Sequence, residues 1–533
     1  MRIVLQGGTV VDGDAARYAN VVVDDGIIAE IVADSESDRG VVNEADAIID
    51  CRGRMVLPGF IDVHSHADGL LRDGGVQRAL LTQGVTSVIA GQDGVSYAPG
   101  DGQYAGEYFA AINGPHRTYS GGGVAGYLAA ADRESRLNVA YLVPAGTVRW
   151  EVCGRSTAPA DGSQVEAMAA LVDAGMQDGA VGLSTGLDYV PGIFAPSSEI
   201  AALCAPVAAA GGVYVSHMRG GYEANSDSGI DEIRSIAQAA GVRAHVSHFH
   251  ADPDVVLAGM STLDRAGVDA TFDAYPYMRG CTLLGMPLLP PGLSAQPVDT
   301  VVDTLSDPIE RATLRRDWFP AVERNASLGP EWPAMVTLSH IAAVEFTWAC
   351  GLSVEQAADR AGLDAIDFVL DVLAASRLEV NAVMAVRHDR SADDLARIFA
   401  HPGHMGGSDG IFIGDHPHPR ARGTFARYLR EFVRERSTWT WGQAAAHLAT
   451  APAERFGLGR RGKVRQGWVA DLIVVDPASV ADTATYDAPL GEAVGIDDVL
   501  VAGRPVLRSG VMTDCTPGAG LRRDDARAPG KGR

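Results

Sequence analysis

The chain is poor in lysine, with only Lys463 and Lys531 among its 533 residues. Both lie near the C-terminus, so a mechanism that needs a lysine in the central part of the chain is excluded. The six cysteines are scattered, and none of them forms the Cys-x-x-Cys pair of a redox or metal motif. We therefore expect free thiols in a reducing compartment.

Long hydrophobic runs are also missing, since none reaches the roughly 18 residues that a membrane-spanning helix needs. Residues 1–14 lack the apolar core and cleavage site of a signal peptide, which predicts a cytoplasmic protein. A net charge of −23 repels phosphate backbones and disfavours a nucleic-acid partner. The expected partner is thus a small-molecule substrate, with no membrane and no nucleic acid, and the oligomeric state stays open.

Segments rich in short apolar runs occur at both ends of the chain. Residues 1–57 and 456–515 both show this pattern, with Gly and Asp turns between the apolar runs. Because they flank a long α/β region, we predict one small β-sandwich domain built from both termini. Residues 516–533 are rich in Gly, Arg, Asp and Pro, which predicts a disordered tail.

The central residues 58–455 alternate short apolar strands with helical stretches. About eight such units predict a parallel sheet closed into a TIM-like (β/α)8 barrel. The candidate strands lie at 60–63, 86–89, 139–142, 180–183, 213–216, 244–247, 270–272 and 405–408. Residues 279–335 interrupt this rhythm, and we expect an insertion there that covers the barrel mouth as a lid.

The strongest chemical signal is a His-x-His pair, His64 and His66, directly after an apolar strand. Side chains alternate along a strand, so both imidazoles point to one side and can hold one metal ion. Two structural histidines are the alternative explanation, and it is weaker for a His-x-His pair at a strand end than for a single histidine.

Two further candidate strands end in histidine, at His217 and His248. The C-terminal strand ends of a TIM-like barrel converge on one site, so four imidazoles would meet there and are best explained by one or two metal ions. His245 points to the other side of its strand and is predicted to be structural. Asp409 follows the last strand, where it can move a proton from a metal-activated water to a leaving nitrogen. An ordinary Asp-Gly turn is the alternative for that residue.

With these motifs the chain resembles the amidohydrolase superfamily and, within it, the D-aminoacylase group of N-acyl-D-amino-acid deacylases. The similar stretches span nearly the whole chain, at 59–66, 83–86, 182–187, 216–219, 273–277, 407–410 and 418–420. The resemblance implies a zinc-dependent hydrolase of a C–N bond other than a peptide bond, acting on an N-acyl-D-amino acid. It also implies that His217 and His248 hold one tight zinc together with Asp93. A second, weaker site is implied for His64 and His66 with Asp93.

Two departures from the family pattern affect the metal centre and the substrate site. Asp93 stands where the family has a metal-binding Cys; a carboxylate can ligate zinc and bridge two metals, although a harder ligand could change the preferred metal. Other branches of the superfamily bridge their metals with a carboxylated lysine, which this barrel lacks. His250 stands where the family has a Lys, and it either contacts substrate or lies at the rim.

The resemblance further implies that Arg420 and Tyr275 contact the substrate. An Arg can grip a carboxylate through two parallel hydrogen bonds, and a Tyr hydroxyl can donate to a developing oxyanion. A surface charge in an Arg-rich loop is the alternative for Arg420. The nearby histidines are expected to be solvated loop residues, namely His404, His416 and His418.

Two other functions stay open at this point. A cyclic amidase or a heterocycle deaminase would share the barrel and the His-x-His pair, so the fold does not discriminate between them. The missing barrel lysine disfavours the dihydroorotase and hydantoinase type. A catalytically inert scaffold homologue is the third candidate, but such a protein has no physical need for four histidines and Asp409.

Overall fold

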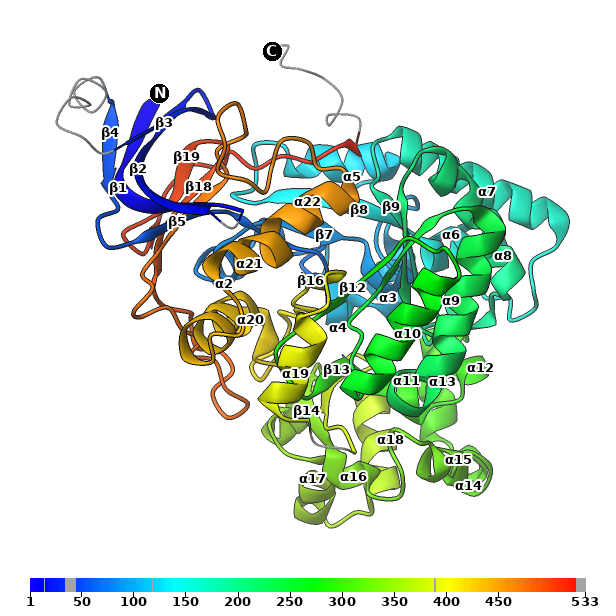
Figure 1. Ribbon diagram of the computed structural model, residues 1–533. Coiled ribbons are helices and arrows are strands. Elements are labelled where there is room, and N and C mark those ends of the chain that lie inside the picture. Colours follow the sequence, from blue (N-terminus) through cyan, green and yellow to red (C-terminus); the bar gives the residue numbers. More distant parts are fainter. Residues whose placement is uncertain (14, 34–44, 117, 388–389, 524–533) are drawn as a thin grey trace.

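The computed structural model describes residues 1–13, 15–33, 45–116, 118–387 and 390–523 (Figure 1). Its centre is an eight-stranded parallel sheet. The strands are β6 (Phe60–Asp62), β7 (Val85–Ala90), β8 (Asn138–Pro144), β9 (Gly182–Gly186), β10 (Val213–His217), β11 (Arg243–Val246), β12 (Ala270–Ala274) and β16 (His404–Gly406).

The sheet closes where β16 meets the chain that follows β6. The Val63 amide donates to the Gly406 carbonyl over 3.3 Å, and the Asp409 amide donates to the His64 carbonyl over 2.7 Å. The first and last strands are therefore neighbours, and the predicted TIM-like barrel is confirmed. The same contacts place His64 and Asp409 side by side at the C-terminal end of the barrel.

Helices surround the barrel because each carries one apolar face. In α9, Ile230, Ile233, Ile236 and Ala237 are buried at the three- and four-residue spacing of a helix. The surrounding helices are α2 (Gly74–Leu81), α5 (Gly123–Ala131), α7 (Gly162–Gln177), α8 (Ser197–Ala209), α9 (Ser226–Ala240), α10 (Pro253–Arg265), α19 (Ala392–Phe399) and α20 (Arg420–Arg427). No helix in the described ranges is long and apolar enough to cross a membrane.

The barrel interior is apolar and is closed at one end by C-terminal residues. Leu521 and Phe456, the last residue of α22 (Ala451–Phe456), pack into the same core as Ile61 and Val215. The Val139 amide donates to the Ala519 carbonyl, and the Leu521 amide donates back to the Val139 carbonyl. The prediction of a disordered tail is therefore wrong for residues 516–523. Backbone hydrogen bonds and the apolar side chain of Leu521 hold this segment in place. The remainder of that tail, 524–533, lies outside the described residues.

The insertion between β12 and α19 is a unit with its own apolar core. Its three strands form an antiparallel sheet in the order β13 (Gly280–Leu283), β15 (Val380–Met384), β14 (Val336–Ile341). Its helices are α11 (Gly285–Leu288), α12 (Pro291–Ser294), α13 (Val298–Ser306), α14 (Pro308–Asp317), α15 (Phe319–Arg324), α16 (Trp332–Met335), α17 (Val354–Ala361) and α18 (Ala365–Ala375). The insertion thus extends to Met384 and not to 335, because the helical pattern of α17 and α18 is indistinguishable from that of barrel helices.

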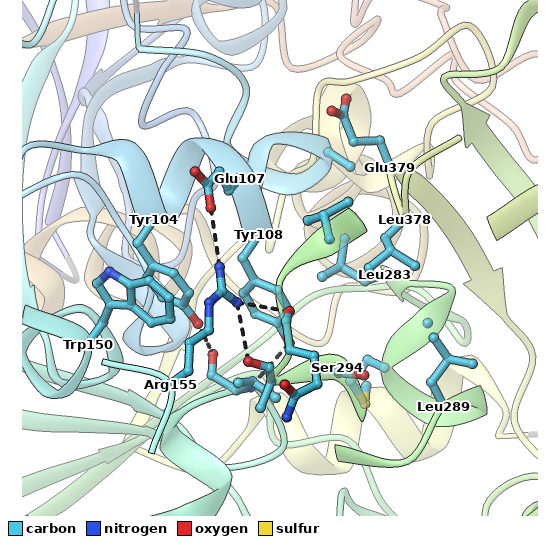
Figure 2. A pocket seen from close by; sticks show the side chains of 17 residues that line it. Tyr104, Glu107, Tyr108, Trp150, Arg155, Leu283, Leu289, Ser294, Leu378 and Glu379 are labelled. Atoms are coloured by element: carbon cyan, nitrogen blue, oxygen red, sulfur yellow. Dashed lines mark hydrogen bonds and ion pairs between the residues drawn. The ribbon is translucent and has the colours of Figure 1, made fainter. Parts of the chain in front are cut away.

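Arg155 fastens the insertion to the barrel (Figure 2). It follows α6 (Ala145–Cys153), and its Nη1 donates to the carbonyls of Ala295 and Gln296 over 3.2 and 2.9 Å. Its guanidinium lies 4.7 Å above the Trp150 ring, and its Nη2 is 3.6 Å from the carboxylate of Glu107 in α3 (Gln103–Tyr108). The contact holds the insertion beside the mouth of the barrel.

Both chain termini build a separate nine-stranded sheet, seen as blue and orange-red strands in Figure 1. Its strands are β1 (Arg2–Asp12), β2 (Ala15–Asp24), β3 (Ile27–Ala33), β4 (Ala47–Asp50), β5 (Met55–Pro58), β17 (Leu472–Val475), β18 (Ile496–Val501), β19 (Arg504–Arg508) and β20 (Val511–Met512). The antiparallel pair of β5 and β17 joins the two halves, and a bridge between Ile27 and Val469 curls the sheet around its own core. The prediction of a small β domain made from both termini is confirmed.

Candidate metal centre

Six side chains with metal-binding atoms converge at the C-terminal end of the barrel. They come from the ends of five strands: His64 and His66 after β6, Asp93 after β7, His217 at the end of β10, His248 after β11 and Asp409 after β16. All six are buried. The four histidines that the sequence singled out therefore lie together with both carboxylates.

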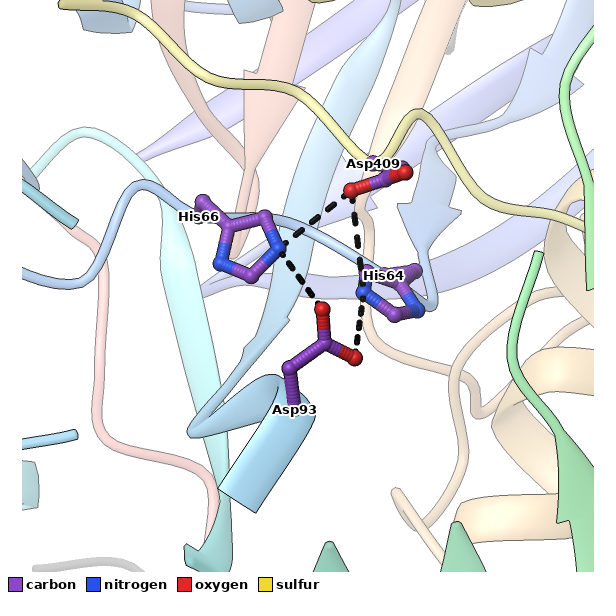
Figure 3. Close-up of side chains that lie close together, drawn as sticks. All are labelled: His64, His66, Asp93 and Asp409. Atoms are coloured by element: carbon purple, nitrogen blue, oxygen red, sulfur yellow. Dashed lines mark ion pairs between the residues drawn. The ribbon is translucent and has the colours of Figure 1, made fainter. Parts of the chain in front are cut away.

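One group consists of His64, His66, Asp93 and Asp409 (Figure 3). The His64 Nε2 lies 3.5 Å from Asp93 Oδ1, and the His66 Nε2 lies 3.6 Å from Asp93 Oδ2. The His66 Nε2 is also 3.3 Å from Asp409 Oδ1. Atoms of four different residues thus surround one point.

A second group consists of Asp93, His217 and His248. The His217 Nδ1 lies 3.8 Å from Asp93 Oδ2, and the His248 Nε2 lies 3.7 Å from Asp93 Oδ1. The two imidazole nitrogens are 3.2 Å apart. Asp93 belongs to both groups, and each of its oxygens faces one histidine of each, as a carboxylate bridging two metals would.

The donor set fits zinc. A zinc ion with nitrogen and oxygen bonds of about 2.0–2.2 Å holds its ligand atoms roughly 3–4 Å apart, as they are here. The His64 Nε2 and Asp93 Oδ1 are buried without a hydrogen-bond partner in the described part of the chain. Buried polar atoms are normally satisfied, so these two need a partner other than the protein.

Three of the converging residues have left-handed backbones: Asp93 (φ 54°), His248 (φ 33°) and Asp409 (φ 48°). Aspartate tolerates this conformation better than most residues, whereas it is strained at His248, and such strain is retained where function requires a fixed side-chain direction. Next to Asp93, a Cβ on Gly94 would lie only 2.7 Å from the Gly186 amide nitrogen. The turn after β7 is therefore packed against β9, which fixes the Asp93 carboxylate.

A layer of polar residues orients the histidines. Asp273 in β12 accepts a hydrogen bond from the His248 amide over 2.9 Å, and its other oxygen lies 3.5 Å from His64 Nδ1 and 3.0 Å from His245 Nε2. Asp188 lies 3.2 Å from His217 Nε2, and the Asn113 side-chain oxygen lies 2.9 Å from His66 Nδ1. The contacts of Asp188 and Asn113 occupy the far ring nitrogens of His217 and His66 and leave the near ones for a metal, while Asp273 faces the far nitrogen of His64.

The sequence gives no role to these three supporting residues. Asp273 lies in a stretch that resembles the family, which is the one signal that could have drawn attention to it. Asp188 and Asn113 (the end of α4, Ala110–Asn113) lie far from their histidines along the chain, and no local pattern marks them.

The charges of the site perturb its titrating groups. Burial alone would raise the pKa of Asp93, but the imidazoles around it lower that pKa well below its usual value. Burial opposes protonation of His66, yet Asp409 and Asp93 raise the pKa of its imidazole to about 10. For Asp409, burial is outweighed by the charge of Arg420 and by nearby histidines, so its pKa is lowered and it is ionised.

Arg420 is fully buried, at the start of α20, and is not the surface charge that was its alternative. Its Nη2 lies 2.7 Å from Asp409 Oδ2, and its guanidinium lies 4.5 Å above the Tyr275 ring. Its Nε and Nη1 have no hydrogen-bond partner among the described residues. His404 and His418 are also buried, so their expected solvation is wrong; apolar and aromatic neighbours enclose both.

A cavity of about 630 Å³ opens onto the metal-binding atoms. Tyr275 and His250 line it, and the insertion contributes apolar wall residues such as Met286 and Trp318. The His250 Nε2 accepts a hydrogen bond from the Tyr275 amide over 3.2 Å. Burial, and next the charge of Arg390, lower the pKa of His250 well below its usual value. The cavity has room for a small substrate between the barrel and the insertion.

The sequence profile of the Amidohydrolase family matches residues 47–277 and 299–507. The chain belongs to the amidohydrolase family. This amidohydrolase is 32% identical to the N-acyl-D-glutamate deacylase of Alcaligenes xylosoxydans xylosoxydans, over 98% of this chain and 96% of that protein.

Solved structures agree with this assignment. The N-acyl-D-glutamate deacylase of Bordetella bronchiseptica, complexed with zinc and a phosphonate mimic of the tetrahedral intermediate, superposes with a TM-score of 0.79 at 30% identity, covering 98% of this chain and 99% of that one. A D-aminoacylase with a binuclear metal centre gives a TM-score of 0.78 at 28% identity, with the same coverage. These similarities confirm the predicted family and fold of this amidohydrolase.

Proposed function

We propose that this amidohydrolase is a zinc-dependent deacylase that converts an N-acyl-D-amino acid into a carboxylate and a free D-amino acid. The observation that carries the proposal is the position of Asp93, whose two oxygens lie between two pairs of histidines at the floor of a substrate-sized cavity. The full-length similarity to N-acyl-D-glutamate deacylases supports it.

In this proposal His217, His248 and Asp93 hold one tight zinc ion. His64 and His66, with Asp93, form a second and weaker site. When bound, zinc polarises the acyl carbonyl and lowers the pKa of water towards about 7. Asp188, Asp273 and Asn113 keep the imidazoles in the orientation and tautomer that ligation requires.

Asp409 would be the proton-transfer residue. Its carboxylate lines the cavity and is held ionised by Arg420, so it can accept a proton from the attacking water. It would then give that proton to the nitrogen of the leaving amino acid. The left-handed backbone and the hydrogen bond from its amide to the His64 carbonyl fix the carboxylate above the histidines.

Arg420, Tyr275 and His250 would bind the substrate. The Nε and Nη1 of Arg420 are buried donors without partners among the described residues, and a substrate carboxylate would satisfy them. The Arg420 guanidinium keeps the Tyr275 ring in place from above, and the Tyr275 hydroxyl would donate to the oxyanion. His250 would offer a neutral hydrogen bond where the family has a Lys.

A substrate screen tests this function. The zinc-loaded protein is incubated with N-acetyl-D-amino acids, their L-enantiomers, hydantoins and dihydropyrimidines, and release of free amine or ring opening is measured. We expect turnover of the D-enantiomers alone, and loss of turnover after chelation. Ring opening without deacylation would show that the enzyme is a cyclic amidase. The cytoplasmic location and the lack of a nucleic-acid partner stay predictions from the sequence, and the oligomeric state stays open.

A further inference from the structure

Arg390 is a buried cation on the wall of the catalytic cavity, between the insertion and α19. Its side chain is 5% exposed. The proposed metal centre and proton transfer do not use it. A buried guanidinium is costly unless other groups balance its charge and accept from its N–H groups, so Arg390 needs anionic or hydrogen-bonding partners beside the substrate space.

Glu223 occupies only some of the hydrogen-bond donors of Arg390. It begins the short helix η4 (Glu223–Asn225) in the loop after β10, with a left-handed backbone at φ 58°. Its carboxylate contacts the Nη1 of Arg390, while the buried Arg390 Nε has no hydrogen-bond partner in the described part of the chain. A guanidinium carries five N–H donors, so Arg390 retains capacity for a second carboxylate.

A second unmatched donor lies on the same cavity wall. Because the His250 Nε2 accepts a hydrogen bond from the Tyr275 amide, the ring proton is on Nδ1. The His250 Nδ1 is buried and also has no hydrogen-bond partner among the described residues. This wall of the cavity therefore offers two unmatched buried donors, the Arg390 Nε and the His250 Nδ1.

The insertion supplies further positive charge to the cavity. Arg279 precedes β13, and Arg387 follows β15, so both ends of the insertion carry an arginine into the cavity lining. The carboxylates of the wall outside the metal centre already have partners: Asp188 contacts His217, Glu223 contacts Arg390, and Asp252 accepts from the Asp254 amide at the start of α10. This side of the cavity is therefore suited to an anionic group.

We propose that Arg390 binds a carboxylate in the side chain of the substrate and thereby makes the enzyme selective for acidic N-acyl-D-amino acids. This inference rests on the proposed function, in which Arg420 takes the α-carboxylate. The side-chain carboxylate would accept from the open edge of Arg390 and from His250 Nδ1, while Glu223 keeps its contact with Arg390 Nη1. Arg390 is thus a specificity-determining residue and takes no part in the bond cleavage.

The test compares N-acetyl-D-glutamate with its uncharged isostere N-acetyl-D-glutamine. The ratio of their kcat/KM values is measured for the wild type, Arg390→Gln and the control Arg397→Gln. Arg397 is the next arginine along the chain and lies in α19; it pairs with Asp254 and is not among the residues that line the cavity. We expect the wild type to prefer glutamate at least tenfold. Arg390→Gln should lower that preference by roughly ten- to a hundredfold, as expected for lost hydrogen bonds to a charged group, while Arg397→Gln keeps it.

The ratio does not depend on the fraction of folded enzyme, because misfolding lowers both rates equally. A wild type without a preference for glutamate, or an Arg390→Gln variant with an unchanged preference, would overturn the inference and leave the deacylase function in place. If the wild type hydrolyses neither of these two substrates but deacylates other N-acetyl-D-amino acids, the inference is overturned and the deacylase function stays. If it deacylates none of them, the proposed function fails, and the Arg390 site is then tested by calorimetric binding of D-glutamate and D-glutamine to the zinc-loaded protein. If the wild type binds D-glutamate more tightly than D-glutamine and Arg390→Gln removes that preference, the carboxylate site is supported. If the wild type binds both amino acids equally, the carboxylate site is refuted.

Discussion

Replacing Asp93 by Asn is the most direct test of the metal centre. Asn tolerates the left-handed backbone at φ 54°, whereas Ala would add roughly 1–2 kcal/mol of strain that is unrelated to metal binding. The change removes one anionic oxygen that lies 3.5–3.8 Å from histidine nitrogens of both groups. Both zinc sites should therefore weaken together.

The size of this effect follows from the position of Asp93. Loss of a residue that merely supports a ligand costs about 10–100-fold in metal affinity, so loss of a shared anionic ligand should cost at least roughly a hundredfold, or about 2.7 kcal/mol. Asp93→Cys restores an anionic zinc ligand and should regain part of the metal and of the turnover.

The assay measures zinc per protein after dialysis against a series of zinc buffers, with amide hydrolysis followed in the same samples. The Arg397→Gln variant is the control that passes through the same dialysis and assay, because Arg397 pairs with Asp254 and does not belong to the metal centre. Metal content and turnover near those of the wild type in Asp93→Asn would show that Asp93 is not a ligand.

Three further outcomes follow from the same geometry. Asp409→Asn should keep most of the zinc and lose turnover by roughly a hundredfold or more, the range of a general acid–base group; a near wild-type rate would exclude that role. Arg420→Lys should impair hydrolysis of the free acid more than hydrolysis of the uncharged amide analogue, because Lys keeps a positive charge near Asp409 but loses the planar fork that would hold a carboxylate; equal losses on both substrates would make Arg420 structural. Zinc affinity of the His64–His66 site should rise with pH, because His66, with its pKa raised to about 10, is protonated at neutral pH and must release that proton to ligate. The expected slope is at least about tenfold per pH unit below pH 10, because the pKa of His64 is raised as well, and calorimetry in buffers of different ionisation enthalpy would show at least one proton released; a pH-independent affinity would contradict it.

The sequence by itself determines the barrel and the direction of its histidines. Strands and barrel helices are defined by periodicities of two and of about 3.6 residues, which are local properties that a single sequence displays. The alternation that places His64 and His66 on one side of the chain, and the histidines at the ends of β10 and β11, could therefore be predicted. The same local information identifies the two β-rich ends of the chain.

Contacts between distant segments were decided only by the tertiary structure. Arg420 pairs with Asp409, and Asp188 supports His217, because barrel closure and the loops bring them together. Residues 516–523 lack any apolar periodicity, yet Leu521 fills the end of the barrel. Arg390 and Glu223 are separated by 167 residues and meet only because the insertion returns to the barrel beside the loop after β10. No local pattern carries that information, since the energy of such pairs arises from the burial that folding itself creates.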